Sequence, residues 1–233
     1  MRKLLYASLF VNLLLLSVFA YWINHRGGWR YIKQTFGIEK KMEPSSYYSI
    51  KSSIFETLPL DSSDIVFIGN SLTDYGHWDE LFPELKIKNR GIGGDDILGV
   101  QSRIDVVLHA QPKKLFLLIG TNDLEYYHDK NLTVERYEQL VAKIKQDAPN
   151  TKLYLLSILP TRGILNRPNK HIVEMNEDIR LISKKFEVTY IDLHSQYKDE
   201  KGELKQDFTL DGIHINGKGY ERWKDVLLPY LME

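Results

Sequence analysis

The feature that most constrains this chain is an alternation of short apolar runs with longer amphipathic stretches, from residue 65 to the C-terminus. Three of the apolar runs are nearly continuous, which is typical of parallel strands that are buried on both faces of a sheet. We therefore predict five strands, at Ile65–Gly69, Lys86–Asn89, Lys114–Ile119, Leu153–Leu159 and Thr189–Leu193.

Apolar residues at helical spacing fill the stretches between these strands. They predict helices around Ile97–Leu108, Tyr137–Ile144, Ile172–Phe186 and Tyr220–Leu231, and Asn216 is placed to cap the last one. Because alternating strands and helices put helices on both faces of a parallel sheet, we predict an α/β fold. Its architecture is a three-layer α/β/α sandwich.

The N-terminus differs from the rest of the chain in composition. Arg2 and Lys3 precede an apolar run of 20 residues, Leu4–Ile23, which is interrupted by the polar Ser8, Asn12 and Ser17 and has two aromatic residues, Tyr21 and Trp22, near its end. A helix of about 20 apolar residues can span a bilayer, and aromatic residues favour its interfaces. We predict a transmembrane signal anchor at residues 1–23, with a cleaved signal peptide as the alternative.

The flanks of this run do not fix its orientation, because lysine and arginine residues lie on both sides of it. A short basic tail before an apolar run is typical of an export signal. We therefore expect a single-pass membrane protein with its folded domain on the exported side, or a secreted protein if the signal is cleaved. Residues 24–60 are interpreted as a stalk that includes a packing helix, and residues 61–233 as the folded domain.

Composition excludes several classes of function. Lysine plus arginine number 31 and aspartate plus glutamate 31, with no basic stripe, so a nucleic-acid partner is not expected. The chain has no cysteine, which excludes disulfides, thiolate metal sites and a cysteine nucleophile. It also lacks H-E-x-x-H, a phosphate loop and a complete G-x-G-x-x-G, so we expect no metal and no cofactor.

Polar motifs follow the first three predicted strands, and ligands of open parallel sheets bind beyond the carboxyl ends of strands. Ser71 comes directly after the first strand, and Asn122 comes after the third. Gly94 lies in a glycine-rich turn after the second strand, just before a helix, where a backbone N–H can meet an anion. Each has a simpler explanation when it is taken alone: a helix cap, a tight turn or a turn residue.

Asp211 and His214 lie three residues apart near the C-terminus, so a single loop can position both side chains. An aspartate bonded to one ring nitrogen fixes the histidine tautomer and leaves the other nitrogen free to accept a proton from a serine. Together with Ser71, Gly94 and Asn122, the pair supplies a nucleophile, a base and oxyanion donors.

These motifs resemble the four blocks of the SGNH superfamily, also called the GDSL esterases. The matching segments are Gly69–Leu72, Asn89–Gly94, Gly120–Asp123 and Asp211–His214, in family order across residues 61 to 231. The resemblance implies a flavodoxin-like fold with a five-stranded parallel sheet, close to the lysophospholipase-like and platelet-activating-factor-acetylhydrolase-like branches. One residue departs from the family pattern, because Asn70 stands where the first block usually has aspartate.

By this resemblance Ser71 is the nucleophile, His214 is its base and Asp211 orients the base. The oxyanion hole is formed by the Ser71 N–H, Gly94 and Asn122. The implied function is that of a serine esterase, which hydrolyses an acetylated glycan, a lysophospholipid or another acyl ester through an acyl-enzyme. No metal or organic cofactor is implied.

Other functions are compatible with the same sequence. An acyltransferase or deacetylase acting on cell-surface glycan or lipid would use the same residues, whereas a carbohydrate-binding module or a membrane scaffold would not need their chemistry. The loops at residues 74–78 and 161–168 are expected to shape the substrate pocket. His77, Trp78 and Arg162 are the candidate lining residues, and the oligomeric state is left open.

Overall fold

The computed structural model describes residues 2–25, 45–126 and 130–233, which form two compact units, Met1–Ser45 and Ser46–Glu233. In the first unit, helix α1 covers Arg2–His25. Among the described residues, no helix combines the length and the apolar character that crossing a membrane requires. The transmembrane prediction for residues 1–23 is therefore not supported. Most of the predicted stalk falls on residues 26–44, outside the described residues, while its packing helix is α3 (Ser46–Thr57).

The second unit is built on a five-stranded sheet with the order β2-β1-β3-β4-β5, and all its strand pairs are parallel. This is the doubly wound order in which ligands bind where the connections change direction, beside β1 and β3. The strands are β1 Ile65–Gly69, β2 Ile87–Gly91, β3 Lys114–Leu118, β4 Lys152–Leu156 and β5 Thr189–Ile191. The five predicted strands are confirmed, although β3, β4 and β5 end before the predicted residues and β2 continues to Gly91.

Alternate side chains of each strand enter different cores, as the pleat of a strand requires. Val66 and Ile68 of β1 belong to one buried cluster, and Ile65 and Phe67 belong to the other. Helices α6 (Ile97–Arg103), α7 (Asp105–His109), α9 (Lys130–Asp147) and α10 (Asn169–Lys185) supply residues to the first cluster. Helices α5 (Trp78–Leu81), α11 (His194–Tyr197) and α12 (Gly217–Met232) supply residues to the second.

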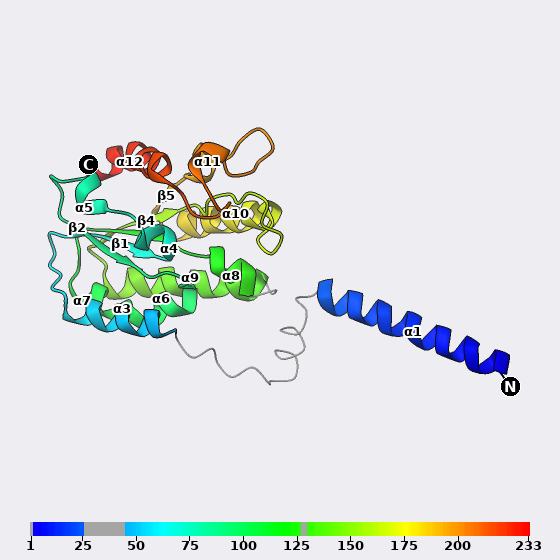
Figure 1. Cartoon of the computed structure of the whole chain (residues 1–233). Coiled ribbons are helices and arrows are strands. Elements are labelled where there is room, and N and C mark those ends of the chain that lie inside the picture. Colours follow the sequence, from blue (N-terminus) through cyan, green and yellow to red (C-terminus); the bar gives the residue numbers. More distant parts are fainter. Residues whose placement is uncertain (1, 26–44, 127–129) are drawn as a thin grey trace. The chain divides into compact units, whose positions relative to one another are not determined.

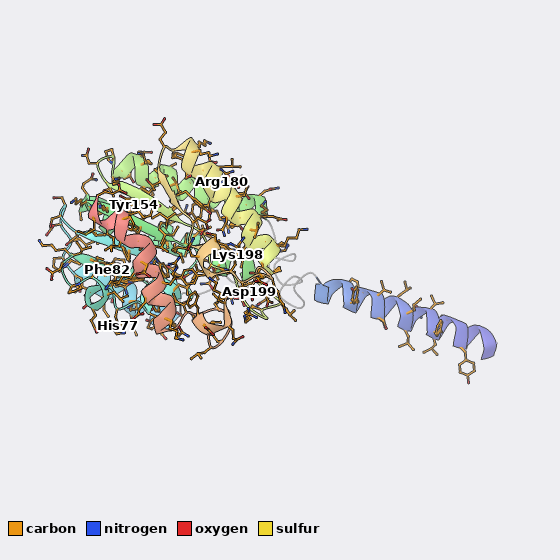
Figure 2. All side chains as sticks on the ribbon, turned by 90° about the horizontal axis from the view of Figure 1, so that it is seen from above. His77, Phe82, Tyr154, Arg180, Lys198 and Asp199 are labelled. Atoms are coloured by element: carbon orange, nitrogen blue, oxygen red, sulfur yellow. The ribbon has the colours of Figure 1, made fainter. Side chains whose placement is uncertain are left out.

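The predicted three-layer sandwich is thus confirmed. Figure 1 shows α11 and α12 on one side of the sheet and α6, α7 and α9 on the other. Figure 2 looks down on α12, with Phe82 and Tyr154 of the second core cluster labelled. Three short helices complete the unit: α4 (Ser71–Asp74), α8 (Thr121–Tyr126) and the 3-10 helix η1 (Gln206–Phe208).

The single helix predicted around residues 97–108 is wrong, because the chain forms two helices, α6 and α7, that meet at Ile104. The Val107 N–H donates to the Ile104 carbonyl at 2.9 Å, a tight turn that starts the second helix. Ile104 remains fully buried through the break. Apolar spacing therefore continues across a change of helix, and spacing alone does not reveal it.

Helix α12 begins where the sequence predicts, with Asn216 as its cap. The Asn216 side-chain oxygen accepts a hydrogen bond from the Gly219 N–H at 3.2 Å, and its amide donates to the Asp207 carbonyl at 2.8 Å. The cap lies two residues after His214, so it also fixes the end of the loop that carries His214.

Asn216→Ala is expected to lower the free energy of unfolding by about 1 kcal/mol, because the first turn of α12 loses its cap. Urea denaturation with an unchanged slope measures this change. Asn216→Ser keeps a capping oxygen but not the amide that reaches Asp207, and it should recover most of the loss. An equal loss in both variants would assign the effect to the Asp207 contact instead.

Candidate active site

The turn that leaves β1 places Ser71 at the carboxyl edge of the sheet. Ser71 is the first residue of α4, and the buried Asn70 caps this helix by accepting the Leu72 N–H at 3.1 Å. Gly69 permits the turn, since a Cβ there would lie 2.2 Å from the Leu118 carbonyl oxygen. The residue that departs from the family pattern therefore has a clear local role, as a cap.

His214 reaches Ser71 from the far end of the chain. The Ser71 Oγ lies 3.0 Å from His214 Nε2, and His214 Nδ1 lies 2.6 Å from Asp211 Oδ2. The other carboxylate oxygen of Asp211 accepts the backbone N–H groups of Ile213 at 2.9 Å and His214 at 2.8 Å. The structure thus brings together the predicted nucleophile, base and orienting carboxylate in a geometry suited to serine catalysis.

The environment of Asp211 keeps its carboxylate ionised. Partial burial would raise the pKa of Asp211, but the hydrogen bonds from the His214 ring and from the Ile213 and His214 N–H groups lower it to about 2. An ionised Asp211 accepts a proton of the imidazole at Nδ1, so Nε2 faces Ser71 without a proton. This is the tautomer that a general base for Ser71 needs.

The predicted oxyanion donors come from neighbouring strand ends. Gly69 at the end of β1 pairs with Gly91 at the end of β2 and with Leu118 at the end of β3. Ser71, Gly94 and Asn122 follow these three strand ends within a few residues. Gly94 adopts φ +81°, a conformation that favours glycine, and its N–H has no hydrogen-bond acceptor among the described residues.

Asn122 is held by partners on both sides of its amide. Its side-chain nitrogen donates to the Asp95 carbonyl at 2.7 Å, and its side-chain oxygen accepts from Arg167 at 3.2 Å. Because an asparagine amide has two N–H groups, the second stays available for an oxyanion. Arg167 is mostly buried and forms an ion pair with Glu125. Sequence reasoning missed Arg167, since it stands 45 residues from Asn122 with no motif around it.

A buried ion pair fixes the turn that carries Gly94. Arg103 donates to Asp95 Oδ2 from two nitrogens, at 2.9 and 2.7 Å, and also to the carbonyls of Gly69 at 3.2 Å and Arg90 at 2.8 Å. Burial raises the pKa of Asp95 to about 6 although Arg103 opposes the shift. Arg103 therefore ties the ends of β1 and β2 to this turn. The sequence offered no signal for it, beyond its position on the helix that follows.

Three residues were predicted to line the substrate pocket: His77, Trp78 and Arg162. The prediction that Trp78 lines the pocket is wrong, because Trp78 is 1% exposed and its ring packs edge-on against Phe67 in the core. The His77 side chain is 79% exposed and lies at the edge of the domain in Figure 2. Arg162 pairs with Asp199 and Glu203 and binds the His214 loop only through its backbone.

The aromatic residue beside the base is instead Tyr75, whose ring lies 5.2 Å from the His214 ring. Tyr75 directly follows α4 and is half exposed, so it is the side chain of the 74–78 loop that borders the site. Within residues 2–25, 45–126 and 130–233, the acidic and histidine side chains form no group of three or more that could hold a metal ion.

Asn70→Asp is expected to fold normally and to keep Ser71 reactive, because an aspartate oxygen caps α4 as an asparagine oxygen does. Thermal unfolding and the rate of fluorophosphonate labelling measure the two effects. Asn70→Leu removes the cap and serves as the contrasting variant, with an expected loss of about 1 kcal/mol or more. A folded but unreactive Asn70→Asp protein would mean that the amide nitrogen has a further role.

Comparison with known proteins identifies the family of this chain. The model of the GDSL-like lipase/acylhydrolase family matches residues 67–222, which include all five predicted site residues. The N-acylneuraminate cytidylyltransferase of Escherichia coli is 30% identical over 68% of this chain, but the match spans only 38% of that protein. The human platelet-activating factor acetylhydrolase IB subunit alpha2 is 26% identical over 68% of this chain and 72% of its own.

A solved platelet activating factor structure from Streptococcus pneumonia has 28% identity and a TM-score of 0.73, covering 81% of this chain and 92% of that one. The fold, the family model and these relatives therefore point to one family. The chain belongs to the GDSL-like lipase/acylhydrolase family, and its activity is that of a carboxylic ester hydrolase.

Proposed function

We propose that this protein removes an acetyl or other short acyl group from an ester through an acyl-enzyme on Ser71. The observation that carries this proposal is the continuous contact from Ser71 Oγ to His214 Nε2 at 3.0 Å and from His214 Nδ1 to Asp211 at 2.6 Å. Such a chain lets a neutral histidine take the serine proton while the carboxylate stabilises the imidazolium that forms.

In the first half of the reaction, Ser71 Oγ attacks the ester carbonyl and its proton passes to His214 Nε2. His214 then protonates the departing alcohol, and the acyl group stays on Ser71. In the second half, His214 takes a proton from water, the hydroxide attacks the acyl carbonyl, and the acid leaves as the Ser71 hydroxyl is restored. Apart from the ester and one water molecule, these steps use only Ser71 and His214, with Asp211 orienting the base.

The negative charge on the carbonyl oxygen is met by the N–H groups of Ser71 and Gly94 and by the Asn122 amide. Each such donor contributes about 3 to 4 kcal/mol where it has been removed from a serine hydrolase. The Asn122 amide is already oriented by the Asp95 carbonyl and Arg167 before substrate arrives. Donors that need no rearrangement during the reaction are the most effective.

The proposed preference for acetyl groups is supported by the name of a relative and not by the shape of a pocket. The human relative is named as an acetylhydrolase of platelet-activating factor, and the Escherichia coli relative is named for an N-acylated sugar. These names support two alcohol classes for this chain, a lipid and a sugar. An ester panel that includes acetylated glycans, a lysophospholipid and p-nitrophenyl esters of increasing chain length separates them.

Ser71→Ala is expected to lower kcat by roughly four orders of magnitude or more on every ester of that panel, with the thermal unfolding temperature nearly unchanged. The p-nitrophenyl acetate assay gives the most direct comparison. Thr73→Ser, a conservative change on the same helix, is the matched control for handling and folding. Retention of wild-type activity in folded Ser71→Ala would remove Ser71 from the mechanism.

Activity should fall on the acid side, because His214 accepts the serine proton only when it is neutral. Ionisation of Asp211 does not contribute to this loss in the working range, since the pKa of Asp211 is about 2. Asp211→Asn should lower kcat by roughly 10²- to 10⁴-fold, because the tautomer is no longer fixed. The pH dependence of kcat/KM for wild type, Asp211→Asn and His214→Ala measures this. A wild-type rate and acid limb in His214→Ala would mean that another residue is the base.

We also propose that the apolar N-terminal run directs the catalytic domain to the exported side of a membrane. The support is the sequence itself, with two basic residues before 20 mostly apolar ones. Mass spectrometry of the mature protein, after fractionation of the cells, tests the proposal. An exported protein that starts at residue 21 indicates a cleaved signal, and a protein found only in the cytoplasm contradicts export.

A further inference from the structure

Helix α3 (Ser46–Thr57) lies outside the region that the family model matches, yet it contacts the turn that forms the oxyanion hole. Two side chains of α3 reach that turn through a single carboxylate, that of Asp74. Asp74 is the last residue of α4, the short helix that begins with Ser71. An element from outside the family core is thus connected to the helix of the nucleophile.

Asp74 is a buried carboxylate with three donors. Its side chain is 3% exposed and lies 2.7 Å from the Lys51 ammonium group, while Tyr47 donates its hydroxyl at 2.5 Å. The third donor is the backbone N–H of Gly93 at 2.9 Å. The hydrogen bond to Asp74 raises the pKa of Tyr47 to about 12, so Tyr47 stays a donor throughout the working range of pH.

Gly93 immediately precedes Gly94, whose N–H is the proposed oxyanion donor. The Gly94 N–H belongs to the peptide group that joins Gly93 to Gly94, so its direction depends on how Gly93 is held. Asp74 holds Gly93 by accepting a hydrogen bond from its N–H. The Tyr47 ring closes over the same glycine, since a Cβ at Gly93 would lie 3.4 Å from the ring. Tyr47 and Lys51 of α3 therefore both act on Gly93, the residue next to the proposed oxyanion donor Gly94.

The rest of α3 is fastened to the same side of the domain. The Tyr48 hydroxyl lies 2.8 Å from the Gly99 carbonyl and 2.7 Å from the Ser102 hydroxyl on α6. Phe55 is buried beneath two guanidinium groups, with Arg90 at 5.0 Å and Arg103 at 5.8 Å from its ring centre. Arg103 is the residue that fixes Asp95, so α3 supports the oxyanion turn at two points.

Burying a carboxylate is costly unless its charge is compensated. Without α3, Asp74 would keep only the Gly93 N–H among the three donors described above. Water would then compete for the Asp74 carboxylate and favour breaking its hydrogen bond with the Gly93 N–H. The oxyanion turn would lose the restraint that this bond provides. The Lys51 charge and the Tyr47 hydroxyl remove this tendency.

We propose that α3 is a positioning element for catalysis, in which Tyr47 and Lys51 hold Asp74 so that Asp74 fixes the Gly93–Gly94 turn in its oxyanion-binding form. This inference rests on the proposed ester hydrolysis at Ser71. The position of α3 sets the turnover rate, because the turn serves the transition state more than the bound substrate. Within the described residues, the side chains of Tyr47, Lys51 and Asp74 form no hydrogen bond with the side chains of Ser71 or His214, so they act through the turn.

The test compares steady-state kinetics of the full-length wild type with Tyr47→Phe, Lys51→Met and the double variant on p-nitrophenyl acetate. Tyr47→Phe keeps the ring over Gly93, and Lys51→Met keeps most of the side-chain length. The double variant should lose about tenfold or more in kcat, a part of what removal of a whole donor costs, with KM changed less than twofold. Lys51→Arg should restore kcat when it replaces Lys51→Met.

Ser53→Ala is the matched control, because Ser53 lies on the same helix and, within the part of the chain that the structure describes, its hydroxyl donates only to the Ile50 carbonyl. Its kcat should equal that of the wild type. Thermal unfolding of each variant is measured alongside, and the single Tyr47→Phe protein provides the comparison if the double variant does not fold. A folded variant with unchanged kcat, or with a change in KM alone, overturns the inference.

Fluorophosphonate labelling separates this inference from the proposed function. The phosphonyl oxygen of the adduct occupies the oxyanion hole, so the labelling rate should fall with kcat in the double variant. A wild type that labels at Ser71, with variants that label equally fast, overturns only the role of α3. A wild type that neither labels nor hydrolyses esters overturns the proposed function itself.

Discussion

The pairing of three parallel strand ends at Gly69 is the constraint on which the rest of the site depends. Gly69 lies between Gly91 and Leu118, so the turns that leave β1, β2 and β3 emerge side by side. A nucleophile, a backbone donor and a side-chain donor can then converge although they are separated by dozens of residues. Only the base must come from elsewhere, and the loop before α12 supplies it.

Charge buried behind the site keeps these turns in place. Asp95 with Arg103 restrains the turn after β2, and Arg167 with Glu125 restrains the Asn122 amide after β3. Such pairs contribute little net stability, because removing the charges from water costs about as much as their attraction returns. Their value here lies in fixed geometry, since oxyanion donors accelerate a reaction only if they are oriented in advance.

Periodicity predicted the strands and the longer helices, because an apolar run with a period of two or 3.6 reports which face is buried. The motif residues Ser71, Gly94, Asn122, Asp211 and His214 could be predicted because each lies in a short block at the end of an element. Arg103, Arg167 and Asp74 could not. Their roles depend on partners that only tertiary packing brings near, and an isolated charge in a sequence more often indicates a solvated surface.

Trp78 shows the opposite error. An aromatic residue next to a catalytic motif suggested a pocket wall, but its indole N–H bonds to the Thr73 carbonyl at 2.8 Å and its ring fills the core. The turn after Ser71 therefore serves packing as well as chemistry. Tyr75, three residues earlier in the same loop, is the side chain that remains beside the base.

The most direct test of this account identifies the residue that becomes covalently modified. The full-length protein is incubated with a fluorophosphonate, digested, and mapped by mass spectrometry before and after heat unfolding. The account predicts one adduct, on Ser71, that forms only in the folded protein and is suppressed by His214→Ala. An adduct on another serine, or ester hydrolysis by a protein in which Ser71 stays unmodified, would contradict it.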